Sequence, residues 1–250
     1  MTTLFHELIY QPIYNVLIFL YDVIPGGDFG IAIIAVTILL KSALIPLSKK
    51  QIQSQKRMQE IQPELKKIQT KYKNDKEKQT KEVMNFYKEN KVNPFSGCFP
   101  IIIQLIFLIA IYRVIINISD AGLVVDGKDL YSFVQNPGEI NKTFIGLVDL
   151  LKPSIPIAIL AAAAQFWQTK LMINKSKKNK ELNKIEKDND KSEPDFSEIM
   201  NKQMMILGPA LTLFIGIKFA AALSIYWLFS TLFSVFQQLY IFKKEDESKK

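Results

Sequence analysis

The chain alternates between long apolar runs and polar stretches that are rich in lysine. A bilayer core of about 30 Å is crossed by roughly 20 helical residues, and the apolar runs are close to that length. We therefore predict an all-α membrane protein with five transmembrane helices, which are expected at residues 29–47, 95–116, 153–173, 204–219 and 221–242.

The first long polar stretch, residues 48–93, is too charged to lie in lipid but has a helical pattern. Apolar residues recur in it at intervals of three and four, as at Ile61, Leu65 and Ile68, and they resume after a polar break. This pattern predicts two amphipathic helices folded back into a hairpin. Pro63 is expected to kink or restart the first of these helices.

The other polar segments predict loops. Residues 117–152 contain Asp-Gly and Asn-Pro-Gly turn signals, and one short helix is expected within them near residues 144–151. Residues 174–202 are rich in lysine, contain Pro194 and lack an apolar period, so a flexible basic loop is predicted there. Residues 243–250 form a short charged tail.

Residues 1–28 are largely apolar but are interrupted by polar side chains, among them Glu7, Gln11 and Asn15. Two structures remain open for this segment, a helix that crosses the bilayer and an amphipathic helix that lies in the membrane interface. The polar interruptions favour the interfacial helix. No basic region precedes a short apolar stretch with a small-residue cleavage site, so we expect neither a removable signal peptide nor a lipoprotein signal.

Lysine and arginine are distributed asymmetrically between the polar segments. There are 13 in residues 48–93, 8 in residues 174–202 and 4 in the tail, against 3 in residues 117–152 and none before Lys41. Because positive residues are retained in the cytosol, the first three segments are predicted to be cytosolic, and the N-terminus and residues 117–152 to be outside. Topology accounts for most of these lysines, although contact with anionic lipid or ribosomal RNA would use the same charges.

The sequence offers few groups for catalysis or metal binding. It has one cysteine, Cys98, and one histidine, His6. A single cysteine excludes an intramolecular disulfide, and these two residues alone cannot form a structural zinc site. No predicted span contains paired carboxylates that could cleave a peptide bond inside the membrane. We therefore expect no enzyme activity, no cofactor and no metal.

Lys41 lies inside the first predicted span, and Thr37 precedes it by one helical turn on the same face. A cation near the bilayer centre costs about 2.5–3.5 kcal/mol even on lenient insertion scales. One interpretation is a hydrated polar pocket inside the bundle, to which Gln104 and Gln165 also contribute. The other is that the Lys41 side chain reaches the cytosolic headgroups. The glutamines favour the pocket, because they would also need partners.

Three functional classes fit an intramembrane cation beside polar side chains. A small-solute transporter or channel is one of them, but the two halves of the sequence show no recognisable inverted repeat. An assembly scaffold that binds partners through the basic hairpin is the second class, and a protein that inserts other proteins into the membrane is the third. Tyr226 and Trp227 lie near the outer half of the last span, where aromatic side chains either anchor in the interface or contact a substrate.

The spans and the hairpin contain motifs in a characteristic order. In the first span Thr37 precedes the basic Lys41 by four residues, and Pro46-Leu47 closes the helix. Further motifs are residues 58–65 in the hairpin, Asn93-Pro94 with Gly97, Cys98, Pro100 and Gln104 in the second span, Gln165-Phe166 with Gln168-Thr169-Lys170 in the third, and Ile225-Tyr226-Trp227 with Gln237-Gln238 in the last. Together they resemble the YidC/Oxa1/Alb3 membrane protein insertases over nearly the whole chain.

The resemblance implies a short form of that family, without the large periplasmic domain. Its core helices would enclose a hydrophilic groove that opens to the cytosol and to the lipid and is closed to the outside. The groove would accept the polar translocated tail of a substrate, without nucleotide hydrolysis, while the substrate's apolar segment moves into lipid. The residues implied are Thr37, Lys41, Gln104 and Gln165 in the groove, and Tyr226 and Trp227 as substrate contacts.

The resemblance also implies partners and a location. Nascent membrane proteins and the lipid bilayer are the expected partners, with the ribosome, the signal recognition particle receptor and the Sec translocon as further candidates. DNA is not expected, and the protein would act as a monomeric insertase and chaperone in the cell membrane. Two departures matter: the family most often has arginine where this chain has Lys41, and the large outer domain that precedes the first core span in many members is not expected here. The tail is also short, without the long basic extension that would favour ribosome docking. Lysine cannot bind a carboxylate in the bidentate manner of arginine.

Overall fold

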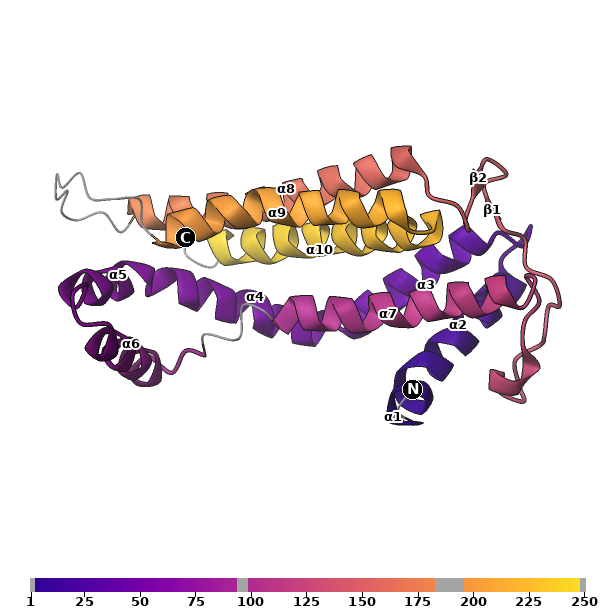
Figure 1. Ribbon diagram of the computed structural model, residues 1–250, viewed down its shortest axis with the longest axis horizontal. Helices are drawn as coiled ribbons and strands as arrows, with labels where there is room; N and C mark the ends of the chain where they lie inside the picture. The colour runs from indigo at the N-terminus through magenta and orange to yellow at the C-terminus, as the bar shows by residue number, and fades with distance from the viewer. Residues whose placement is uncertain (1–2, 94–98, 183–195, 248–250) are drawn as a thin grey trace.

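The computed structural model describes residues 3–93, 99–182 and 196–247, and long helices run side by side through most of it (Figure 1). Cys98 and residues 183–195 of the predicted basic loop lie outside the described residues. The helices are α1 (Thr3–Phe5), the π-helical turn η1 (His6–Tyr10), α2 (Gln11–Val23), α3 (Phe29–Ala43), α4 (Ile45–Glu60), α5 (Gln62–Lys71), α6 (Lys76–Glu89), α7 (Phe99–Asp120), the 3-10 turn η3 (Gly127–Asp129), α8 (Ile155–Leu182), α9 (Phe196–Lys218) and α10 (Ala221–Glu247).

Two of the described helices are long and apolar enough to cross a membrane, at Ile102–Asp120 within α7 and at Ala221–Lys244 within α10. The helix α3 and the first part of α4, Ile45–Met58, meet the same criterion as a pair, although their axes differ by 62°. A shorter apolar helix occupies Met205–Lys218 in α9. By length and composition, the described part of the chain therefore has two candidate spans, or three if the bent pair is one span.

Helix boundaries follow local sequence signals. The Asp28 side chain caps α3 by accepting a hydrogen bond from the Ile31 amide at 3.0 Å. Asp75 caps α6 in the same way through the Lys78 amide. Pro63 lies in the first turn of α5, where its missing N–H removes no helical hydrogen bond, so the helix restarts there as its position predicted.

The helices α5 and α6 pack against each other at one end of the molecule, near the end of α10. The N-terminal segment and the long loop between α7 and α8 lie at the opposite end (Figure 1). Helix also extends into both ends of residues 174–202, where a flexible loop was predicted. Lysine and glutamate are good helix formers, so a charged segment can continue a helix without an apolar period.

The helices α8, α9 and α10 pack closely because small residues line their contacts. Ala158 and Ala161 are buried on α8. A Cβ atom added at Gly216 of α9 would lie 2.6 Å from the Ala158 Cβ and 3.0 Å from the Ser224 Oγ. Small side chains let membrane helices approach to van der Waals contact. On its other side α10 packs against α3 and α7, so it is the central helix of the bundle.

The N-terminal segment has one strongly buried face. Tyr10, Tyr14, Leu17 and Ile18 are almost fully buried, at the spacing of three and four that a helix requires to turn one face inward. The segment packs against α3 and α7. Its polar Asn15 is also buried, with its amide donating to the Asp129 carbonyl at 2.7 Å and its oxygen accepting from a backbone amide. Asn15 and Gln11, two of the polar residues that interrupt this segment, therefore serve contacts within the protein.

The predicted short helix near residues 144–151 is wrong, because the chain forms an antiparallel strand pair there. The strands are β1 (Thr143–Phe144) and β2 (Val148–Asp149), with Phe144 opposite Val148. Ile145 and Gly146 between them have φ of +54° and +68°. Two consecutive positive φ angles form a tight turn, here within a connection of three residues, and cannot occur within a right-handed helix.

Candidate functional site

The sequence-predicted site residues come from α10 and from three helices that pack against it. Thr37 and Lys41 lie on α3, Gln104 on α7, Gln165 on α8, and Tyr226 and Trp227 on α10 itself. The structure joins most of them through hydrogen bonds in two neighbouring groups, one toward α3 and α7 and one toward α8. We use the name polar cluster for Lys41, Gln104, Ser230 and Ser234, which form the first group.

The Lys41 ammonium points into the bundle. Its Nζ donates to Gln104 Oε1 and to Ser234 Oγ, each at 3.3 Å. The Ser230 hydroxyl also donates to Gln104 Oε1, at 3.0 Å. Among the described residues no carboxylate lies within ion-pair distance of Lys41, so neutral oxygen atoms alone meet its charge. An ammonium held in this way can still accept a negatively charged partner.

Gln104 has an unused hydrogen-bond donor. Lys41 offers only donors, so the amide oxygen of Gln104 must face it, and the Nε2 then points elsewhere. This Nε2 is buried and has no partner among the described residues. Leaving a buried donor unpaired costs about 1–3 kcal/mol. The polar cluster therefore favours binding of a further hydrogen-bond acceptor, such as a carboxylate or a peptide carbonyl.

The second group links α8 to α10 through Gln165. Its Oε1 accepts from Trp227 Nε1 at 3.3 Å and from Thr231 Oγ1 at 3.4 Å. Because both donors come from one helix, a turn apart, the glutamine sets the rotation of α10 against α8. Trp227 is half-buried, which leaves part of its ring available to a further contact.

Thr37 and Tyr226 are both buried, whereas a residue that lines an open groove would be exposed. Thr37 is fully buried, and its hydroxyl donates to the Ile33 carbonyl at 2.6 Å, a bond within its own helix. Tyr226 is also buried, and its hydroxyl interacts with Ser230 and Gln104. Tyr226 therefore supports the polar cluster from inside the bundle, and Thr37 lies one turn away from it.

Sequence reasoning missed the hydroxyl side chains of α10. Ser230 and Ser234 are four residues apart and bond to the other members of the polar cluster, whereas Thr231 bonds to Gln165. The available signal was the repetition of small polar residues at helical spacing within an apolar span. That signal is weak, because serine and threonine can satisfy their hydroxyls on the carbonyl four residues earlier, as Ser234 does on Ser230 at 2.9 Å.

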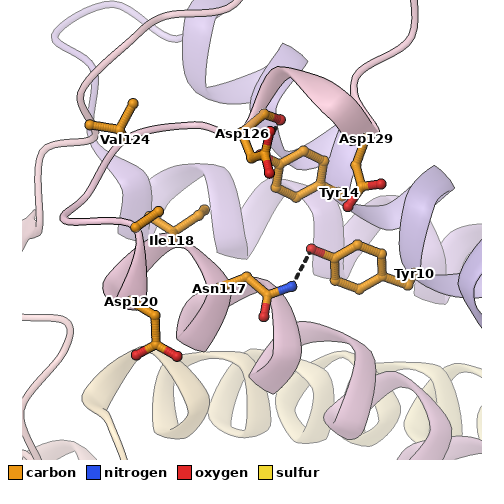
Figure 2. Close-up of a pocket in the computed structure, with 9 residues that line it drawn as sticks. Tyr10, Tyr14, Asn117, Ile118, Asp120, Val124, Asp126 and Asp129 are labelled. Carbon is orange, nitrogen blue, oxygen red and sulfur yellow. Dashed lines mark hydrogen bonds between the residues drawn. The ribbon is translucent and has the colours of Figure 1, made fainter. Parts of the chain in front are cut away.

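A separate pocket of about 230 Å³ lies at the opposite end of the bundle from α5 and α6 (Figure 2). It is lined by Tyr10, Tyr14, Asn117, Ile118, Asp120, Ala121, Val124, Asp126 and Asp129. Burial raises the pKa of Tyr10, whose hydroxyl accepts from Asn117 Nδ2 at 2.7 Å. His6 contacts Asp129 at 3.1 Å beside it. These bonds tie the N-terminal segment to α7 and the loop that follows.

The arrangement of the polar cluster suits binding by hydrogen bonds and charge. It presents an ammonium, an unpaired amide and two hydroxyls on helices that are otherwise apolar. Within the described residues, no group of three or more histidine, cysteine, aspartate or glutamate side chains could hold a metal ion. Such a site favours a polar or acidic segment that enters from water over an apolar one.

Residues 19–249 match the protein family described as 60Kd inner membrane protein. The chain is 35% identical over 219 residues to the membrane protein insertase YidC of Fusobacterium nucleatum subsp. nucleatum, covering 87% of this chain and 88% of that relative. It is 34% identical over 223 residues to YidC of Clostridium tetani, covering 89% and 86%. It is 35% identical over 219 residues to YidC 1 of Lactococcus lactis subsp. lactis, covering 86% of this chain and 68% of that relative. The whole polar cluster lies inside the family match.

Proposed function

The chain belongs to the YidC/Oxa1/Alb3 family of integral proteins of the cell membrane, and from this membership we propose that it is a membrane protein insertase. In this proposal it inserts newly made membrane proteins into the lipid bilayer and helps them to fold as a chaperone. The reaction needs no nucleotide hydrolysis, because burial of the substrate's apolar segment in lipid is itself favourable.

The observation that supports this function most directly is the polar cluster on otherwise apolar helices. Moving a polar tail through hydrocarbon is costly because its groups lose their hydrogen bonds to water. The Lys41 ammonium and the unpaired Gln104 Nε2 supply replacement partners for carboxylates and carbonyls in such a tail. A tail docked there has less hydrocarbon to cross without hydrogen-bond partners. Meanwhile the substrate's apolar segment moves out between the helices into lipid.

We propose that the polar cluster and Gln165 line a hydrophilic groove between α3, α7, α8 and α10. The groove would open to the cytosol and to the lipid and be closed to the outside. Trp227 would contact the substrate, since its ring is half-buried beside Gln165. Tyr226 and Thr37 would act from behind the groove, because both are buried.

The proposed topology has five crossings, with the N-terminus outside and the C-terminus in the cytosol. Apolar residues of α3, α7, α8, α9 and α10 would form the five spans, and residues 1–28 would lie in the outer interface. The count of 13 basic residues in 48–93, against 3 in 117–152, supports this orientation. So does the position of α5 and α6 at the opposite end from the N-terminus (Figure 1).

In this proposal the hairpin of α5 and α6 lies in the cytosol and recruits partners. Its lysine-rich surface would attract anionic lipid, the ribosome or the signal recognition particle receptor. The Sec translocon is a further candidate partner. The protein itself would act as a monomer, because the groove is built from helices of one chain.

The proposal is tested by insertion into liposomes that contain this protein alone. The substrate has one apolar segment and a short acidic tail, and protection of the tail from added protease measures its translocation. Protection well above that of empty liposomes is expected, and its loss is expected in a variant that combines Thr37→Val, Lys41→Met and Gln104→Leu. The variant Lys218→Met is the matched control, because it removes an exposed lysine from the end of α9. Background protection with the wild-type protein would overturn the proposal.

A further inference from the structure

The turn between β1 and β2 presents two large apolar side chains outward. Ile145 is 62% exposed and Leu147 is 87% exposed, which are among the highest values of any apolar residue in the described chain. They lie on either side of Gly146. The turn is closed by a hydrogen bond from the Leu147 amide to the Phe144 carbonyl at 3.0 Å, so both side chains project from the tip of the hairpin.

Ile145 occupies a backbone conformation that isoleucine rarely adopts. Its φ is +54°, and a β-branched side chain in the left-handed region is strained. Asparagine or glycine would be favoured at a position of a hairpin turn that requires a positive φ. Strain of this kind persists only where the surrounding structure holds it, and it is concentrated at functional sites. The strained and exposed Ile145 side chain is therefore a candidate for a contact outside the fold.

The hairpin is held firmly against the starts of two core helices. The Ile145 amide donates to Asp28 Oδ2 at 2.5 Å, so one carboxylate caps α3 and fixes the turn. Phe144 packs directly on Gly30, where an added Cβ would overlap the phenyl ring. At the other end of the hairpin, the amide of Ala221 at the start of α10 donates to the Lys152 carbonyl. The tip therefore has a fixed position relative to the bundle.

That position continues the apolar outer surface of the membrane helices. The hairpin lies beside the first turns of α3 and beyond the start of α8 (Figure 1). Ile31 on α3 and Ile155 and Ile159 on α8 are exposed large apolar residues near these helix starts. In a membrane-embedded bundle such residues face lipid, so the hairpin tip extends a lipid-facing surface at the level of the headgroups.

We propose that the tip of this hairpin inserts into the adjacent leaflet of the bilayer, with Ile145 and Leu147 in contact with lipid acyl chains. The amides of Ile145 and Leu147 are both bonded, so these donors can enter an apolar environment at no further cost. Lys142 and Lys152 flank the hairpin at its base, where each ammonium lies within 4.0 Å of the Asp149 carboxylate but remains exposed, so both cations can also reach lipid phosphates. Through its bonds to α3 and α10, the inserted tip anchors the outer ends of the helices that carry the polar cluster.

A fluorescent label at the tip tests the insertion. The full-length protein carrying Cys98→Ser and Leu147→Cys is labelled with an environment-sensitive dye and reconstituted into liposomes. Two references use the same background: Ile159→Cys on the exposed face of α8 and Gln135→Cys on the exposed loop. Quenchers attached to the lipid chains are expected to quench label 147 as they quench label 159, at a depth of about 5–10 Å below the headgroup boundary.

Two outcomes would overturn the proposal. Quenching of label 147 by aqueous iodide, to the extent seen at position 135, would place the tip in water. Protection from both kinds of quencher would place it against protein, such as a second copy of the chain.

A second variant, Ile145→Asn, separates anchoring from strain. Asparagine adopts the left-handed conformation easily, so the hairpin keeps its shape while the tip loses an apolar group. Label 147 is then expected to become more accessible to iodide and less quenched from the lipid. An unchanged depth would contradict a role for Ile145 in the membrane.

Discussion

Replacing Lys41 by methionine should separate the charge of the polar cluster from its structural role. Methionine keeps the length and apolar stem of the side chain and removes the ammonium. The fold should tolerate this change, because both groups that accept from Lys41 keep another hydrogen bond: Gln104 Oε1 still accepts from Ser230 at 3.0 Å, and the Ser234 hydroxyl still donates to the Ser230 carbonyl at 2.9 Å. The free energy of unfolding should therefore change by about 1 kcal/mol or less.

The effect on substrates with acidic tails should be larger. A hydrogen bond to a charged group contributes about 1.5–3 kcal/mol, and each 1.4 kcal/mol is a factor of ten. Water in the groove would screen part of this energy, so we expect the Lys41→Met variant to insert an acidic tail about tenfold less efficiently. A tail in which glutamine replaces each glutamate should lose little.

The assay compares these two tails on the same apolar segment in liposomes, with protease protection as the readout. The Lys41→Arg variant is the matched control, because it restores a cation and should recover most of the insertion of the acidic tail. Equal losses with the acidic and the neutral tail would refute the charge argument. They would leave Lys41 with a structural role only.

Two further substitutions test the packing that positions the site. Gly30→Ala should destabilise the protein by about 1–3 kcal/mol, because the new Cβ would overlap Phe144. Gly208→Ala is the control and should be neutral, because its new Cβ meets no atom closer than 3.9 Å. Thermal unfolding in detergent distinguishes the two variants. Asn15→Ala should loosen the N-terminal segment by about 2–3 kcal/mol, since this buried side chain makes three hydrogen bonds. Faster amide exchange in that segment is the measurement, with the exposed Asn136→Ala as control, and unchanged exchange would contradict the prediction.

The candidate site was only partly predictable from the sequence. Lys41, Gln104 and Gln165 stand out because a polar group in an apolar run is costly and needs a partner. Ser230, Thr231 and Ser234 do not stand out, since their hydroxyls can be satisfied within their own helix. Thr37 shares a helix face with Lys41, yet its hydroxyl is used by the Ile33 carbonyl.

The outer loop shows the same limit. Residues 144–151 have a composition that allows a helix, and the prediction of one was wrong because Ile145 adopts a positive φ. Nothing in an isoleucine side chain signals that conformation. Asp28 and Gly30 hold the turn in place from a distant part of the chain, through a hydrogen bond and a close contact.

By itself, the sequence determined that this protein is helical, that it belongs in a membrane and which family it belongs to. The membrane location can be predicted because transfer of each segment from water to lipid depends on that segment's own composition. The tertiary structure alone decided which polar side chains meet. Contacts such as those between Lys41, Gln104 and Ser234 depend on how each helix is rotated about its axis and placed against its neighbours. Those quantities follow from packing across the whole bundle, where small residues on α8 and α9 set the distances, and no single segment encodes them.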